Sequence, residues 1–424
     1  GPNIIWTFIF CLANLILIGI KFFLGRKNMK KLLAVTAATA MMVTTAFAGS
    51  HSNIKIGVIL GFTGPIESLT PSMGDGAEFA MKEVTDSGKL LGGASVTSVR
   101  ADSTCIDAAA ATAAAERLIT SDGVKGIMGA DCSGVTGAIL ANVALANGVV
   151  MISPSATSPG LSTAEDNGLF FRTAPSDARQ GVVMTEVLME QGIKEVAVTY
   201  TNNDYGKGLA DSFAAAFEAA GGTVTINASH EDGKADYSAE VGALAAAGGD
   251  RLVVAGYVDQ GGSGIVRAAL DSGAFDTFHF PDGMIGAKLE ENFGSEIDGS
   301  TGQHPGTDSP GAAKFADMVG GAFDATSPFT PESYDAAALI MLAMQAAGSA
   351  EPGDYKSKVM DVANAPGEMI YPGELGKALD ILASGGEIDY VGATAVELIG
   401  PGESAGNYRQ IEVSGGKIST VQYR

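Results

Sequence analysis

A regular alternation of short apolar runs with longer amphipathic segments constrains the fold of this chain more than any other feature. From residue 53 onward, β-branched runs of strand length, such as IKIGVIL (54–60), alternate with segments of helical period, such as GDGAEFAMKEVTDSG (74–88). Strand–helix–strand spacing of this kind predicts a parallel sheet with helices on both faces. In this first unit we expect strands at 54–60, 95–102, 124–130 and 148–154, and helices at 74–88, 107–123 and up to about 147.

A second unit of the same kind begins after LFFRTAPSD (169–177). Here we expect helices at 178–191, 206–221, 236–248 and 261–272, and strands at 195–202, 223–228, 251–257 and 277–283. From about residue 305 the chain is rich in Gly and Pro, and we then expect helices at 331–347 and 353–364 and a strand-rich tail. Two α/β units in series predict two similar lobes, with a ligand in the cleft at the carboxyl ends of their strands.

The first 48 residues differ in character from the rest. Residues 29–48 have a short basic start, an apolar middle and small residues at the end, the layout of a secretory signal peptide cleaved after Ala48. This predicts export to the periplasm. The preceding apolar segment, within residues 1–28, is about long enough to cross a bilayer. We interpret it as upstream sequence translated ahead of a start at Met29, and a membrane anchor is the alternative.

Charge excludes one class of partner. Residues 1–48 hold five of the 26 Lys and Arg residues and none of the 48 Asp and Glu residues, so the remaining chain carries 21 basic against 48 acidic residues, a net charge of −27. Such a surface repels nucleic acid and anionic membranes. We therefore expect no nucleic-acid partner.

Two cysteines, Cys105 and Cys132, remain after the leader. An even pair in an exported chain predicts a disulfide. On the chain-entropy estimate, a cross-link over this separation adds about 3–4 kcal/mol of stability.

Cys132 and Ser133 stand side by side in GADCSG (129–134), where a nucleophile, a structural cysteine and a ligand-holding hydroxyl are all conceivable. A hydrolase elbow reads G-x-S-x-G, which this stretch misses by one residue. No recognisable catalytic context surrounds any histidine after the leader: His51, His230, His279 and His304. We therefore interpret Ser133, at the expected start of a helix, as an anion-binding hydroxyl, with a plain N-cap as the alternative.

Further polar turns follow other expected strands. ISPSATSP (152–159) offers the N–H and O–H groups of Ser155, Ala156 and Thr157 beside Ser133, although turn chemistry alone also explains them. In the second unit, Tyr205, Tyr257 and Asp282 stand at strand ends, and a carboxylate there can pair with a ligand ammonium group. The loop GFTGP (61–65) lacks the dinucleotide fingerprint, and the scattered histidines show no metal-ligand spacing. We expect no cofactor and no metal.

Taken together, these segments resemble the periplasmic solute-binding proteins of branched-chain amino-acid ABC transporters. The resemblance rests on IGVILGFTGP, GDGAEFA, the Cys105 and Cys132 pair, GADCSG, ISPSATSP, LFFRTAPSD, NDYGKGLA, AGY and FPDG. It implies a type I periplasmic-binding-protein fold, with two doubly wound parallel-sheet lobes joined by a three-strand hinge. The implied lobes are 53–174 plus 305–402 and 175–304 plus 403–424, with crossings near 172–176, 303–308 and 400–406.

The resemblance also implies roles for particular residues. The expected ligand contacts are Ser133, Ser155, Ala156 and Thr157 for an α-carboxylate, Asp282 for an α-ammonium group, and Tyr205, Tyr257 and Tyr334 for the pocket walls. Where family members often carry an aromatic residue in the first loop, this chain has Leu69. The implied function is capture of an aliphatic or branched-chain amino acid by a monomer and its delivery to an inner-membrane ABC permease, without catalysis. Binding of another small organic acid or amide, a membrane-tethered sensor and an exported hydrolase are the alternatives.

Overall fold

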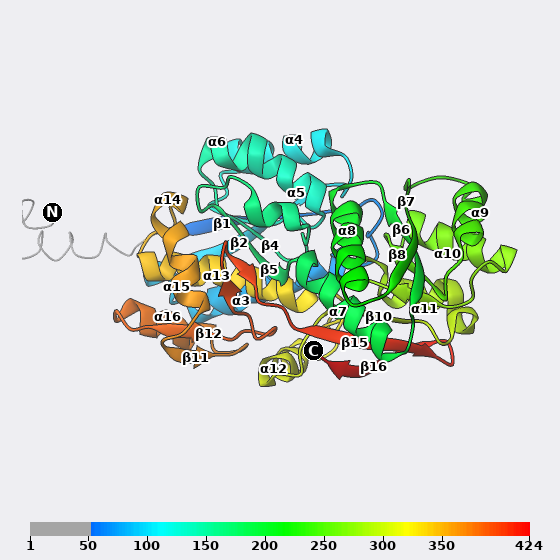
Figure 1. Cartoon of the computed structure of the whole chain (residues 1–424). Helices are drawn as coiled ribbons and strands as arrows, with labels where there is room; N and C mark the ends of the chain where they lie inside the picture. Colours follow the sequence, from blue (N-terminus) through cyan, green and yellow to red (C-terminus); the bar gives the residue numbers. More distant parts are fainter. Residues whose placement is uncertain (1–51) are drawn as a thin grey trace, which may run out of the picture. The chain divides into compact units, whose positions relative to one another are not determined.

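Two seven-stranded sheets organise residues 52–424, the part of the chain that the computed structural model describes (Figure 1). The expected signal peptide and the segment before it lie outside the described residues. Within residues 52–424, no helix combines the length and the apolar character needed to cross a membrane.

The first sheet has a parallel centre, as the strand–helix rhythm predicted. Its strand order is β13-β14-β5-β4-β3-β1-β2, and only the edge pair β13–β14 is antiparallel. The strands are β1 (Asn53–Leu60), β2 (Ser95–Asp102), β3 (Ile127–Gly129), β4 (Met151–Ser153), β5 (Phe170–Pro175), β13 (Leu398–Ile399) and β14 (Glu403–Ser404). The connecting helices are α3 (Thr70–Ser87), α4 (Ala108–Thr120), α5 (Ser133–Ile139) and α6 (Leu145–Asn147), the last two joined by a π-helical turn. Strands β3, β4 and β5 are wholly buried, as expected for a sheet covered on both faces.

The second sheet repeats this plan with an antiparallel edge. Its order is β16-β15-β10-β9-β8-β6-β7, with β15 antiparallel to both of its neighbours. The strands are β6 (Glu195–Thr201), β7 (Thr223–His230), β8 (Arg251–Ala255), β9 (Phe278–Phe280), β10 (Thr301–Pro305), β15 (Tyr408–Ser414) and β16 (Lys417–Tyr423). The helices are α7 (Asp177–Glu190), α8 (Asp204–Ala219), α9 (Ser238–Ala247), α10 (Gly261–Ser272) and α11 (Ala287–Phe293).

The chain passes between the two sheets three times. It crosses after β5, between β10 and α12 (Pro310–Val319), and between β14 and β15 (Figure 1). The predicted crossings, near 172–176, 303–308 and 400–406, lie at or next to these points. Because Glu403 and Ser404 pair with β5, they belong to the first sheet, whereas the prediction had assigned them to the second lobe.

The segment between the second and third crossings completes the first unit. Its main element is α13 (Thr330–Ala347), which packs against α3. Residues Ala336–Met344 of α13 are fully buried, which suits a helix that is apolar on all sides. The remaining elements are α14 (Pro352–Tyr355), α15 (Val359–Ala363), α16 (Leu375–Ala383), and the short parallel pair β11 (Glu368–Ile370) and β12 (Ile388–Tyr390). The single helix expected at 353–364 is thus two helices with a 3₁₀ turn between them.

Candidate functional site

A small cavity lies where the carboxyl ends of strands from both sheets meet. Its lining comes from the segments that follow β1, β3, β4, β6, β8 and β9, including the first turns of α5 and α8, and from the residue before α13. The lining residues are Ile66, Leu69, Asp131, Cys132, Ser133, Ser155, Tyr205, Tyr257, Asp282, Gly283 and Phe329. The space open to the centre of a water molecule is about 20 Å³, room for about one or two waters. The space between the two lobes at this point is therefore very small.

Asp282 is the carboxylate of this cavity on the side of the second sheet. It follows β9 and is buried. Its Oδ1 accepts hydrogen bonds from the Tyr205 hydroxyl at 2.7 Å and from the Gly283 N–H at 2.8 Å. Its Oδ2 accepts from Gln180 Nε2 at 2.9 Å. Burial raises the pKa of Asp282, and the hydrogen bonds from Tyr205, Gln180 and Gly283 oppose that shift.

Tyr205 and Tyr257 form one wall beside Asp282. Their rings stack with centroids 5.2 Å apart and an interplanar angle of 19°. Asn203 caps α8 by accepting the Gly206 N–H at 3.0 Å, which fixes the first turn that carries Tyr205. The Nδ2 of Asn203 also donates to the Tyr257 hydroxyl at 3.4 Å. The structure thus brings Tyr205, Tyr257 and Asp282 together as predicted.

Ser133 and Ser155 face the cavity from the first unit. Ser133 is the first residue of α5, and its Oγ accepts the N–H groups of Thr157 at 3.2 Å and Ser158 at 3.0 Å. With both lone pairs engaged, Ser133 can offer a ligand only its hydroxyl proton. The Oγ of Ser155 donates to the Asp131 carbonyl at 3.0 Å. Of these two hydroxyls, only that of Ser133 still has its proton free to donate to a ligand.

The turn after β4 uses its backbone N–H groups internally, which differs from the prediction. The N–H groups of Ser155 and Ala156 point at Ser153 Oγ, at 3.3 and 2.9 Å. Neither Ala156 nor Thr157 lines the cavity. Thr157 instead supports Ser133 from behind through its N–H. The N–H groups of Ser155, Ala156 and Thr157 therefore donate to neighbouring serine hydroxyls and are not free to bind a ligand.

The predicted Cys105–Cys132 disulfide is confirmed, with an S–S distance of 2.06 Å. It ties the loop after β2 to the residue that precedes Ser133. Asp131 reinforces the same loops, because its carboxylate accepts from the Gly61 N–H at 2.6 Å and from the Ser103 hydroxyl at 2.8 Å. Burial raises the pKa of Asp131, and these hydrogen bonds oppose the shift. Together these contacts fix the position of Ser133.

The apolar wall consists of Ile66, Leu69 and Phe329. Helix α3 begins at Thr70, four residues earlier than expected, and this places Leu69 at its N-cap. Phe329 has a left-handed φ of 66° just before α13, a conformation that is uncommon for a bulky residue. Ile66, Phe329 and Asp131 line the cavity although no sequence pattern predicted them as site residues.

Tyr334 lies away from the cavity, contrary to the expectation from the resemblance. It is buried on α13 with its ring near Phe79 and Phe315. Its hydroxyl donates to Glu83 Oε2 on α3 at 2.6 Å. Phe329, five residues earlier, provides the aromatic contact from this part of the chain instead.

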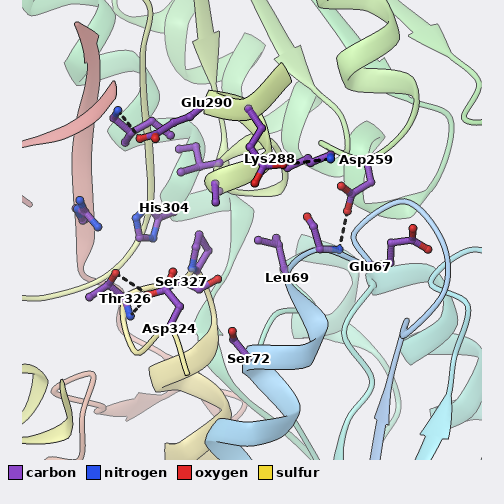
Figure 2. A pocket seen from close by; sticks show the side chains of 18 of the residues that line it. Glu67, Leu69, Ser72, Asp259, Lys288, Glu290, His304, Asp324, Thr326 and Ser327 are labelled. Atoms are coloured by element: carbon purple, nitrogen blue, oxygen red, sulfur yellow. Dashed lines mark hydrogen bonds and ion pairs between the residues drawn. The ribbon is translucent and has the colours of Figure 1, made fainter. Parts of the chain in front are cut away.

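A larger pocket lies on the other side of Leu69 (Figure 2). Its space open to the centre of a water molecule is about 830 Å³. Figure 2 shows Glu67, Asp259, Lys288 and Glu290 among the charged side chains that surround it. Leu69 lines both spaces, so it separates the small cavity from this outer pocket.

Two α/β lobes joined by three crossings, with a polar cavity at the strand ends of both, define a two-lobed solute-binding protein. The family of periplasmic binding proteins matches residues 53–367, and the chain belongs to this family. The Leu/Ile/Val-binding protein homolog 3 of Brucella melitensis is 30% identical over 332 residues, which cover 77% of this chain and 89% of that protein.

Solved structures show the same fold. The branched-chain amino-acid transporter substrate-binding protein LivJ of Streptococcus pneumoniae, in complex with isoleucine, has a TM-score of 0.72 at 22% identity and covers 88% of this chain and 99% of its own. A solute-binding protein of an ABC transporter from R. palustris, in complex with benzoate, has a TM-score of 0.68 at 19% identity, with 88% and 96% covered. The type I periplasmic-binding-protein fold and the predicted resemblance are both confirmed.

Proposed function

We propose that this chain is the periplasmic ligand-binding component of an ABC importer and that it captures a free α-amino acid with an aliphatic side chain. One observation carries the proposal: the cavity offers a buried carboxylate, Asp282, on one side and the free hydroxyl proton of Ser133 on the other. Such a site suits an ammonium group at one end of a ligand and a carboxylate at the other. The apolar wall then receives the side chain.

The charge of the lining favours a zwitterion over a simple acid. None of the residues that line the cavity within the described chain is Lys, Arg or His. A benzoate-like anion would therefore face Asp282 without a compensating cation, and this electrostatic cost disfavours it. The benzoate complex of the R. palustris neighbour nevertheless makes small organic acids the second candidate.

In this proposal the protein acts by a change of conformation, from an open to a closed arrangement of the two lobes. A ligand that contacts both lobes favours the closed form by its differential affinity for that form. We propose that the closed, loaded monomer then delivers the amino acid to an inner-membrane permease. No step in this proposal makes or breaks a covalent bond.

Calorimetric titration of the protein, unfolded and refolded to remove bound ligand, tests the proposal. The panel is L-leucine, L-isoleucine, L-valine, L-alanine and L-threonine against benzoate and 4-methylpentanoate, which is leucine without its ammonium group. We expect binding of at least one amino acid and none of 4-methylpentanoate. Binding of the acids alone would establish the second candidate instead.

Asp282→Ala sharpens the test. Loss of a buried charge partner costs about 2–5 kcal/mol, so we expect amino-acid affinity to fall by roughly 30-fold or more. Asp271→Ala, at an exposed position on α10, is the matched control and leaves affinity unchanged. Unchanged affinity in Asp282→Ala would remove Asp282 from the site.

A further inference from the structure

A second buried carboxyl group, Asp177, lies behind Asp282 and is joined to it by one glutamine. Gln180 Nε2 donates to Asp177 Oδ1 and to Asp282 Oδ2, both at 2.9 Å. Gln180 Oε1 accepts the backbone N–H of Asp282 at 3.2 Å. Gln180 therefore holds Asp282 by both its backbone and its side chain. Asp177 and Gln180 are on α7 and are fully buried.

A chain of hydrogen bonds through the second unit fixes the orientation of the Gln180 amide. Gln303 Nε2 donates to Gln180 Oε1 at 3.2 Å, so Gln303 Oε1 faces His279 Nε2, 2.8 Å away. His279 Nε2 must then carry the ring proton, and Nδ1 accepts from the Thr301 hydroxyl at 3.0 Å. Burial lowers the pKa of His279 to about 3, which keeps the ring neutral.

The far end of this chain is a cation. Arg251 Nη1 donates to Thr301 Oγ1 at 3.2 Å. Each donor from Arg251 through Thr301, His279, Gln303 and Gln180 thus points toward the two carboxyl groups. Hydrogen bonds aligned in one direction polarise one another. The opposite amide orientation would place Gln180 Oε1 against both carboxyl groups, so the arrangement has one consistent assignment.

The two carboxyl groups share a buried site, and no Lys, Arg or His within residues 52–424 forms an ion pair with either of them. Arg172 Nη2 is engaged by Glu403 Oε2 at 2.5 Å, and its Nη1 donates to the carbonyls of Ala156 and Ser158. The other titratable groups that face the pair are phenols, from Tyr205, Tyr257 and Tyr408. Burial, and then the charge of Asp282, raise the pKa of Asp177 well above its usual range, although the Thr157 hydroxyl, the charge of Arg172 and the Gln180 amide oppose the shift.

An unused oxygen marks where a proton can reside. Asp177 Oδ2 is buried, and neither it nor the nearby Thr157 hydroxyl takes part in a hydrogen bond of ordinary geometry among residues 52–424. An ionised carboxylate with such an oxygen is far more costly to bury than a neutral carboxyl group. Two adjacent buried carboxyl groups also resist ionising together. The geometry thus favours one proton and one negative charge on the pair when the cavity holds no cation.

We propose that the ammonium site is a two-carboxyl unit in which Asp177 and Gln180 are positioning residues for Asp282, and that Asp177 gives up a proton to solvent when a ligand ammonium group enters. The inference rests on the proposed function, because it assigns the partner of the ligand's ammonium group. An ammonium cation beside Asp282 lowers the repulsion that keeps Asp177 neutral. Binding is then linked to proton release, and affinity rises with pH while the ligand remains a zwitterion.

Calorimetry of L-leucine binding at pH 7.5, in phosphate and in Tris, measures this proton release, because both buffers take up protons at that pH and differ in ionisation enthalpy. We expect the wild-type protein to release a fraction of a proton there, and its Kd to fall severalfold between pH 5 and pH 8. Asp177→Asn keeps the shape and has no proton to release, so we expect no buffer dependence and a Kd constant within about twofold. A purely structural role for Asp177 would change Kd equally at every pH.

Gln180→Met tests positioning separately. It removes the bridge at nearly constant volume, and we expect affinity for L-leucine to fall about tenfold or more while 4-methylpentanoate remains unbound. Wild-type protein that binds L-leucine without proton release overturns the inference, and so does Asp177→Asn with wild-type release. Absence of binding to every amino acid in the panel is a different result, because it refutes the proposed function itself. The wild-type measurement decides the question even if a variant does not fold.

Discussion

Replacement of Glu332 by Gln should stabilise the protein at alkaline pH and leave it unchanged at acidic pH. Glu332 is in the first turn of α13, next to the second crossing between the lobes, and is 2% exposed. Its Oε2 is buried without a hydrogen-bond partner in the described part of the chain. Burial, with a smaller contribution from the charge of Asp335, raises the pKa of Glu332 to about 8. The folded protein therefore keeps this group neutral.

The magnitude follows from linkage. The folded protein holds a proton on Glu332 up to about pH 8, whereas the unfolded chain loses it near the ordinary value of 4.5. The folded state thus binds more protons in this window, so the free energy of unfolding falls as pH rises from about 4.5 to 8. At about 1.4 kcal/mol per pKa unit, the total loss is roughly 5 kcal/mol. The amide of Glu332→Gln has no proton to lose, so the stability of this variant does not fall with pH for this reason.

Urea denaturation followed by circular dichroism, at pH 4.5, 6 and 8, measures the effect. We expect Glu332→Gln and wild type to agree within about 1 kcal/mol at pH 4.5 and to diverge by several kcal/mol at pH 8. Glu116→Gln, on the exposed face of α4, is the control and should track wild type throughout. A gap that is equal at pH 4.5 and pH 8, or a variant less stable than wild type at pH 8, would refute the reasoning.

Two further changes test the first-unit side of the cavity. The double variant Cys105→Ser, Cys132→Ser removes a cross-link over a separation of 27 residues. We expect the free energy of unfolding to fall by about 3–4 kcal/mol, as measured by denaturant titration. Wild-type protein with its disulfide reduced should lose the same amount of stability. Ser133→Ala removes a hydroxyl donor and should weaken amino-acid binding by about 1–3 kcal/mol in calorimetry, and undiminished affinity would contradict the role proposed for this hydroxyl. Thr120→Ala, at an exposed position of α4, is the control for both.

Sequence patterns predicted those elements whose signals are local. The strand at 95–102 and the helix at 261–272 have the predicted bounds. Asp107, expected as the start of a helix, is its N-cap and accepts the N–H groups of Ala109 and Ala110 at 2.9 and 3.0 Å. The helix expected from residue 74 begins at Thr70, and Pro71 at its start was a signal that the prediction did not use.

Elements whose formation depends on residues far away in the sequence were not predicted. Strand β10 has the sequence TGQHP, which contains no apolar run, and it is a strand because β9 and β15 flank it. Its polar side chains are buried because they serve the hydrogen-bond chain through His279 and Gln303. The alternation of apolar and polar residues cannot reveal such a strand, because its buried side chains are polar. Their hydrogen-bond partners lie 22 or more residues away in the sequence.

The site was predicted where its residues follow strands and missed where it depends on unusual backbone or on long-range contacts. Asp282, Tyr205 and Ser133 follow apolar runs, so their convergence could be inferred. Phe329 reaches the cavity through a left-handed conformation that no sequence pattern signals for Phe. Gln180 reaches Asp282 across 102 residues of sequence, and nothing local in α7 distinguishes it from an ordinary polar helix residue.

Direct contacts between the two lobes also hold the cavity in its present form. The Ser68 N–H donates to Asp259 Oδ2 at 2.8 Å, and the Asp259 N–H donates to the Pro65 carbonyl at 3.1 Å, so the loop before α3 is held by the second lobe. Leu69 sits against Gly286, where an added Cβ would lie 2.8 Å from Leu69 Cδ2. A cavity with room for about one or two waters must open before an amino acid enters, and opening breaks these contacts at a net cost of about 0.5–1.5 kcal/mol for each hydrogen bond. Because the same contacts re-form on closing, the ligand has to supply only the remainder of the free energy of closure.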